Sequence, residues 1–173
     1  MALDVEKMVR EKMEAAAKDK KNKDEKADAA IWAAVLVNAG MGAVPFGINV
    51  WTFVGVSTAM VVYLGKLYGK FLSHEEAGKL VKHVLLSVGW MWGTTTLGLK
   101  FFAEVLKGAG VITMGGTTVA GMALDAGLSG GVTYALGFTT KSYFKQGGEL
   151  SEEEIRREFK AKFKEGKEKI KNR

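Results

Sequence analysis

Long uncharged stretches separated by short charged ones dominate the pattern of this chain. The residues between Asp28 and Lys66 include no charged side chain, whereas the chain on either side of them is rich in Lys and Glu. A helix or strand at the surface of a water-soluble domain needs a polar face, so such a long uncharged run is rare in one. The pattern indicates that this stretch is either embedded in a membrane or very deeply buried.

The pattern predicts helices throughout the first half of the chain. Residues 3–27 are typical of a charged helix with a thin apolar stripe, and the uncharged run predicts helices over 29–43 and 46–71. Proline is favoured in the first turn of a helix and disfavoured inside one, so the turn between the two helices is expected at the chain's single proline. The predicted hairpin turn comprises Pro45, Phe46 and Gly47.

The length of these two helices leaves two arrangements open. Their uncharged portions are shorter than the roughly 20 residues that cross the hydrocarbon core of a bilayer. The hairpin is therefore either a pair of short spans or a wedge that enters and leaves the membrane on one side.

Two capping boxes predict where later helices begin. In Ser73–Glu76 and Ser151–Glu154, a Ser hydroxyl and a Glu three residues later can each bond the other's backbone N–H. The first box is expected to start a helix that continues through the apolar residues 84–99. Together with a helix predicted over 118–145, it forms a second apolar hairpin.

Small residues recur every four positions in the helix predicted over 118–145. This spacing allows two helix backbones to approach closely, which is how helices associate in lipid. The ridge therefore predicts close helix packing, and self-association of the chain is a more specific form of the same hypothesis. The ridge residues are Ala123, Gly127, Gly131 and Ala135.

The last predicted helix is basic and amphipathic. Its narrow apolar stripe is surrounded by Lys and Arg, as in helices that lie on an anionic membrane or dock on a partner. A helix that packs on its own bundle with a solvated outer face would have the same pattern. The expected membrane or partner surface comprises Arg156, Arg157, Phe159, Lys160 and Phe163.

These elements divide the chain into three parts of one all-α, membrane-associated bundle. Residues 1–28 form a charged N-terminal helix, residues 29–145 form the domain of two apolar hairpins, and residues 146–173 form the basic C-terminal helix. Both ends and the segment 66–83 are rich in charge, so the positive-inside rule places all three on the cytoplasmic side.

The amino-acid composition limits the kinds of site and partner that this chain can have. The chain has 22 Gly, one Pro, no Cys and a net charge of +6. The absence of Cys excludes disulfides and thiolate metal sites. A basic balance suits nucleic acid or an anionic lipid surface, and the neighbouring uncharged runs favour membrane lipid over nucleic acid.

The C-terminal half resembles a known family. Residues 116–167 contain a Gly/Ala-rich helix, then Tyr134-Ala135-Leu136-Gly137, Tyr143-Phe144, a short Gly turn and the SEEE helix. This order resembles the GTPase-associated helical domain of unknown function. Gly42-Ala43-Val44-Pro45-Phe46, followed by an apolar helix to Tyr68-Gly69, resembles the first hairpin of that domain, and the resemblance covers residues 29–170.

The resemblance implies an all-helical, membrane-associated accessory module. The family occurs in bacterial YcjF-like inner-membrane proteins and beside Era-like and dynamin-like GTPases, so an inner-membrane location with cytoplasmic termini is expected. It supplies no catalytic residues to carry over. Because no GTPase domain is present in this chain, a GTPase partner is expected to act in trans.

The sequence predicts no enzyme, cofactor or metal site. The stretch Gly137–Ser142 ends like a phosphate-binding loop, but Thr140 stands where the second Gly is required and no strand is predicted before it. His74 and His83 lack carboxylates at a metal-binding spacing, and no Ser, His and acid are predicted to converge.

Asp125 is the candidate intramembrane polar residue, because a charge at membrane depth is costly and therefore a functional hypothesis. The leading hypothesis is a non-enzymatic scaffold or adaptor that self-associates, recruits a partner or shapes the bilayer. The alternatives are an oligomeric channel with Asp125 in its lumen, and a soluble helical module that buries its apolar run in a tight oligomer. Local pairing of Asp125 with a Lys is the simpler interpretation of that residue.

Overall fold

The computed structural model describes residues 2–42, 49–89 and 126–172, in which there are six helices and no strand. The all-α class predicted from the sequence is therefore confirmed. The helices are α1 (Ala2–Ala17), α2 (Lys23–Gly42), α3 (Asn49–Leu67), α4 (His74–Ser87), α6 (Ala126–Lys145) and α7 (Glu152–Lys171).

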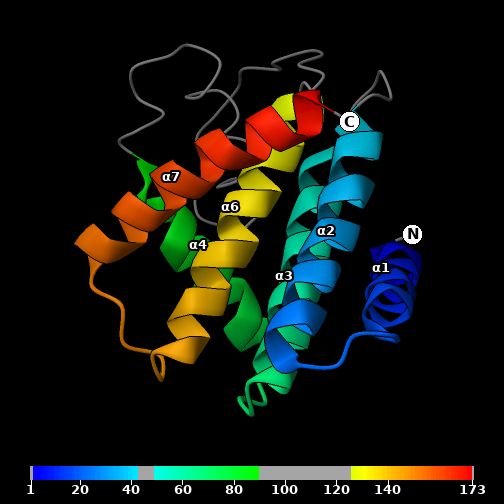
Figure 1. The fold of residues 1–173 in the computed structure, drawn as a ribbon, viewed down its shortest axis with the longest axis horizontal. Helices are drawn as coiled ribbons and strands as arrows, with labels where there is room; N and C mark the ends of the chain where they lie inside the picture. Colours follow the sequence, from blue (N-terminus) through cyan, green and yellow to red (C-terminus); the bar gives the residue numbers. More distant parts are fainter. Residues whose placement is uncertain (1, 43–48, 90–125, 173) are drawn as a thin grey trace, which may run out of the picture.

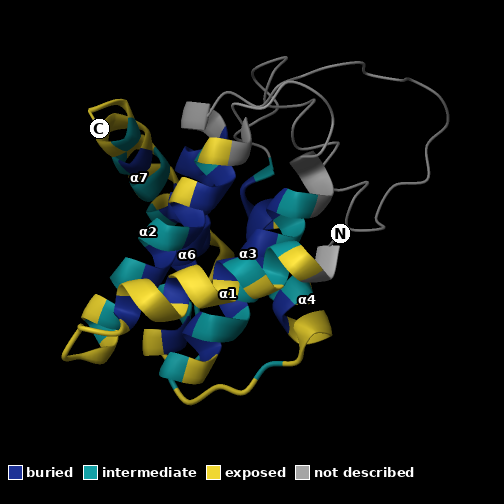
Figure 2. Cartoon of the chain, turned by 90° about the vertical axis from the view of Figure 1, so that its right-hand side faces the viewer, coloured by how far each residue is buried: buried dark blue, intermediate teal, exposed yellow. Residues whose placement is uncertain are grey.

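Helices α2, α3 and α6 form the centre of the bundle, and the two charged terminal helices cover it. α1 lies across α2 and α3, α7 lies across α6, and α4 packs on α3 (Figure 1). The buried residues face the inside of this arrangement, and the exposed residues of α1 face outward (Figure 2). The largest fully buried side chains include Met13, Ile31, Phe53, Met60, Tyr134 and Phe159.

Much of the described part of the uncharged run is buried within a single chain. Ile31 and Val35 of α2 and Val56 and Leu64 of α3 are completely buried, although they belong to the run that the sequence assigns to a membrane or a deep core. Burial of aliphatic side chains removes apolar area from water and stabilises the bundle by roughly 1.5–3 kcal/mol for each.

The first helix is shorter than predicted. Instead of one helix over residues 3–27, the chain breaks between Ala17 and Lys23, and a second helix starts there. Asn22 provides the cap: its Oδ1 accepts the N–H of Glu25 at 2.8 Å, and its Nδ2 donates to Oε1 of Glu25 at 2.8 Å. An Asn at the N-cap replaces the Ser hydroxyl of a capping box, so the backbone donors are satisfied and α2 starts at Lys23.

Other helix ends also differ from the expectation. α3 ends at Leu67 and not near residue 71, because Gly69 adopts φ 77° and the N–H of Lys70 bonds back to the carbonyl of Gly65 at 2.8 Å. This left-handed glycine is a common helix terminator. α4 stops at Ser87, before most of the apolar stretch 84–99 expected to continue it.

Both predicted capping boxes are present. Ser73 accepts the N–H of Glu76, Ser151 accepts the N–H of Glu154, and each Glu side chain accepts the N–H of its Ser. The local pattern was sufficient here because all partners lie within one turn of helix.

Glycines bring α6 and α7 together. A Cβ on Gly166 of α7 would lie 2.8 Å from Cβ of Tyr134 on α6, and a Cβ on Gly131 of α6 would lie 2.9 Å from Cγ of Lys167 on α7. Neither position has room for a larger residue without a shift of the neighbour. The small residues on both helices therefore set the separation of this pair within the chain.

We predict that Gly166→Ala destabilises the fold by about 1–3 kcal/mol, because the added methyl group would overlap Cβ of Tyr134 and force α7 away from α6. The matched control is Gly40→Ala, since a Cβ there meets nothing within 4 Å and alanine favours the helix by roughly 0.5–1 kcal/mol. Urea unfolding followed by circular dichroism measures both. Equal stability of the two variants would contradict the tight contact.

Candidate functional site

Charge is separated along the axis of the bundle. The charges of α2 end at Asp28, the single charge of α3 is Lys66, and those of α6 begin at Lys141. The start of α2 and the last turns of α3 and α6, which carry these charges, lie at the same end of the bundle (Figure 1). At the opposite end, which we call the uncharged end, lie the helix termini that flank residues 43–48 and 90–125.

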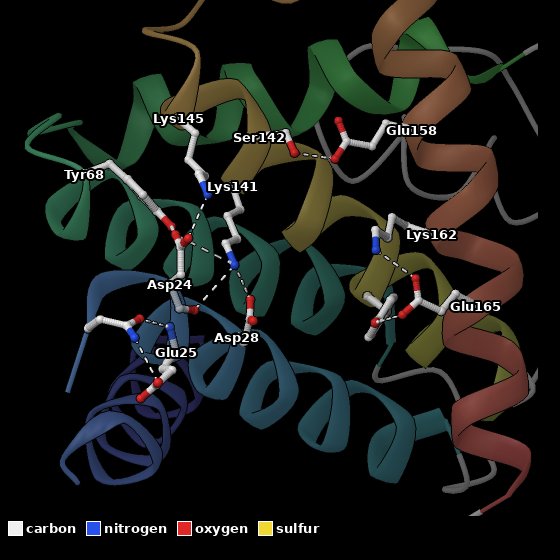
Figure 3. Close-up of polar contacts among 12 residues, drawn as sticks. Asp24, Glu25, Asp28, Tyr68, Lys141, Ser142, Lys145, Glu158, Lys162 and Glu165 are labelled. Atoms are coloured by element: carbon white, nitrogen blue, oxygen red, sulfur yellow. Dashed lines mark hydrogen bonds and ion pairs between the residues drawn. The ribbon is translucent and has the colours of Figure 1, made fainter. Parts of the chain in front are cut away.

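An ion-pair network ties the helices together at the charged end (Figure 3). The side chain of Lys141 is only 12% exposed, and its Nζ lies 2.5 Å from Oδ1 of Asp28. Asp24 accepts bonds from the Tyr68 hydroxyl at 2.5 Å and from Nζ of Lys145 at 2.7 Å. The bond from Lys145, followed by that from Tyr68, lowers the pKa of Asp24, and burial raises the pKa of Tyr68.

A second network joins α6 to α7 through Glu165. The carboxylate of Glu165 accepts from Lys162 at 2.8 Å, from Lys169 at 2.6 Å and from the Tyr134 hydroxyl at 2.7 Å. The Lys162 bond, then the Lys169 bond, lowers the pKa of Glu165 to about 2, and burial raises the pKa of Tyr134. Ser142 of α6 also donates to Glu158 of α7 (Figure 3).

Neutral polar side chains connect α2 and α6 nearer the uncharged end. Asn38 donates through Nδ2 to Oγ1 of Thr133 at 2.8 Å, and the Ser129 hydroxyl donates to the carbonyl of Asn38 at 3.1 Å. All three residues are buried, at 3% exposure or less. A hydrogen bond between neutral groups can hold two helices together where an ion pair would need to be desolvated. The sequence pattern does not single out these residues, because the bonded positions are more than 90 residues apart.

The predicted surface of α7 divides into a buried and an exposed part. Phe159 is completely buried and Phe163 is half-buried, so the apolar stripe packs on the bundle instead of facing outward. Nε of Arg156 donates to the carbonyl of Ser87 at 2.7 Å, which ties α7 to the end of α4. Arg157 and Lys160 are exposed. Phe159 thus departs from the expectation, because α6 supplies the apolar partner that a membrane could have supplied.

The small-residue ridge is partly described. Gly131 lies against Phe163 and Lys167 of α7, and Ala135 is completely buried. Gly127 belongs to α6, but its surroundings are outside the described part. The remaining predicted residues lie outside the described ranges, and these are Ala123, Asp125, Pro45, Phe46 and Gly47.

A cleft of about 330 Å³ lies between α1 and α3. Its lining mixes acidic, basic and apolar side chains, and Nε2 of His74 lies 3.5 Å from Oε1 of Glu6 at its edge. Burial, followed by the nearby Glu14, raises the pKa of Tyr63 in its wall. In the described ranges, no three side chains of metal-ligating type come together.

The geometry defines a small all-helical bundle in which the three central helices, α2, α3 and α6, carry their charges at one end. None of the helices described has both the length and the apolar character required to cross a bilayer. The family described as a domain of unknown function (DUF697) matches residues 8–168, and the chain belongs to this family. No curated protein and no solved structure matches it at a significant level.

We predict that Glu165 contributes pH-dependent stability. Its pKa in the folded state is about 2, below its ordinary value of 4.5, so its stabilising effect is complete above about pH 4.5 and is lost as the pH falls toward 2. Glu165→Gln should therefore lower the free energy of unfolding at neutral pH by about 1 kcal/mol, a value that allows for solvent screening.

Urea unfolding at several pH values measures this effect, with Glu168→Gln as the control on an exposed residue of the same helix. The difference between the wild type and Glu165→Gln should shrink as the pH falls below about 4.5. A difference that stays constant with pH would contradict the assigned role of the carboxylate.

Proposed function

We propose that the protein is a non-enzymatic, membrane-associated adaptor. In this proposal the uncharged end of the bundle enters one leaflet of a bilayer, while the charged end and the terminal helices remain in water and receive a partner protein. The observation that carries the proposal is the separation of charge along α2, α3 and α6, whose charged residues all gather at one end.

The cost of burying charge supports this orientation. A charged side chain at the centre of a bilayer costs about 2.5–3.5 kcal/mol or more, whereas the uncharged end carries no such group on α2, α3 or α6. Polar groups near that end, such as Asn38 and Thr133, bond one another within the bundle. The sequence between α2 and α3, residues 43–48, also contains no charged side chain.

The terminal helices limit how deep the insertion can be. α1 lies across α2 and α3, and its outward face carries charged residues such as Arg10 and Lys12. These side chains would need to stay at the headgroups or in water. We therefore propose a wedge that enters and leaves on one side and not a set of spanning helices.

The proposed partner class comes from the family resemblance, and the geometry bears on the assembly. A GTPase acting in trans is the partner class that the family resemblance implies, and the chain's water-exposed charged faces are the surfaces we propose for it. Self-association through the glycine ridge is not part of this proposal, because α7 covers Gly131 within the chain.

A second candidate is an adaptor that works entirely in water and covers its uncharged end with a partner. The observation that favours it is the completeness of the core: residues of the uncharged run such as Ile31 and Met60 are already fully buried by the chain itself. The two candidates differ in whether the isolated protein binds lipid.

We predict that the protein floats with vesicles of phosphatidylcholine and phosphatidylglycerol in a sucrose gradient and stays with them after a carbonate wash. Gly40→Glu places a charge near the uncharged end at a position with free space, and should reduce the retained fraction by about fivefold or more. Ala15→Glu adds the same charge to the exposed face of α1 and should leave retention unchanged.

Wild-type protein that remains at the bottom of the gradient would support the aqueous adaptor and exclude the membrane wedge. Equal loss in the two Glu variants would show that net charge, and not the uncharged end, governs lipid binding.

A further inference from the structure

Five basic residues form one continuous stripe along α7. They recur at alternating intervals of three and four residues, which places them on one face of a helix. All five are exposed, and at about 1.5 Å per residue the stripe extends over roughly 21 Å. The residues of this stripe, which we call the α7 basic stripe, are Arg157, Lys160, Lys164, Lys167 and Lys171.

Three acidic residues of α7 make contacts within the fold. Glu154 closes the capping box, Glu158 accepts from Ser142, and Glu165 accepts from Lys162 and Lys169. Beyond the first turn, Glu168 is the only acidic residue of α7 that is exposed. Contacts within the fold thus engage several acidic side chains of α7, and the exposed charge of the helix is mainly positive.

Within the described ranges, none of the five residues forms an ion pair with another side chain. Lys167 lies over the ring of Phe163 at 5.7 Å, which leaves its charge available to a further partner. On the opposite side of the helix, Ile155 and Phe159 are completely buried, and Gly166 abuts Tyr134. The stripe is consequently held on a fixed helix that cannot rotate without breaking these contacts.

The other covering helix does not share this feature. The exposed charges of α1 are balanced, with Lys7, Arg10 and Lys12 against Asp4, Glu11 and Glu14. A row of five exposed basic residues is therefore a property of α7 and not a general result of the net charge.

We propose that the α7 basic stripe is the docking surface for an acidic helix of a partner protein. A partner helix with Asp or Glu at intervals of three and four residues would present the complementary row of charges. This inference rests on the proposed adaptor role and specifies the chemistry of the partner.

One observation favours a protein partner over a lipid surface. A helix that lies in a membrane interface buries an apolar face there, but Ile155 and Phe159 on the apolar face of α7 are already buried in the core of the bundle.

The test measures binding of the full chain to a fluorescent synthetic peptide by anisotropy, without membranes. One peptide is a helix with Glu at alternating intervals of three and four residues, and the second has the same composition with Glu distributed around the helix. The stripe variant replaces Arg157, Lys160 and Lys164 with Gln, and the matched control replaces Lys7, Arg10 and Lys12 with Gln. Circular dichroism verifies that both variants fold.

We expect the protein to prefer the first peptide and the stripe variant to bind it about tenfold more weakly, with little change in the control. Binding should weaken with added salt, since the charges are exposed. Equal losses in the two variants, or equal binding of the two peptides, would overturn the proposal. If the stripe substitutions weaken binding to vesicles of phosphatidylcholine and phosphatidylglycerol but not binding to the peptide, the proposal is also overturned, in favour of a lipid surface.

The peptide-binding experiment and the flotation experiment test the two proposals independently. If the protein fails to float but discriminates the two peptides through the stripe, the membrane wedge is excluded and the docking surface stands. If it floats but does not discriminate them, the docking surface alone is excluded.

Discussion

The contact between Tyr134 of α6 and Gly166 of α7 fixes much of the remaining structure. Because Gly166 has no side chain, the Tyr134 ring can lie against the backbone of α7 and its hydroxyl can reach Glu165. The carboxylate of Glu165 also accepts from Lys162 and Lys169, so four polar groups are satisfied at one place on the helix pair. This orientation of α7 buries its apolar stripe and turns its basic residues outward.

The chain uses two kinds of polar contact in two parts of the same bundle. At the charged end, Lys141 and Asp28 join α6 to α2 by an ion pair that is close enough to water to be hydrated. Toward the uncharged end, Asn38 and Thr133 join the same two helices by a neutral hydrogen bond. Both contacts specify the register of α2 against α6, but only the neutral one is compatible with surroundings that exclude water.

Local features of the fold could be predicted from the sequence and long-range features could not. Ser73 and Ser151 predicted helix starts correctly because their partners lie three residues away, and Asn22 carries the same local signal with an amide in place of a hydroxyl. The stripe that contains Phe159 was recognisable as an apolar face, but its periodicity is identical whether the partner is α6, a lipid or another chain. Only the three-dimensional contacts distinguish these cases.

The spacing of the glycine ridge likewise does not say which helix packs on it. Small residues at intervals of four predict close approach of a second helix without stating which helix, and here α7 occupies the position over Gly131. Self-association through this face would require α7 to leave. Its departure would expose Ile155 and Phe159, at a cost of roughly 1.5–3 kcal/mol each, and would separate Glu165 from Tyr134. Such a rearrangement is favourable only if another apolar surface covers the buried face of α7 after it leaves α6. α7 can therefore pack on α6 or on that other surface, but not on both at once.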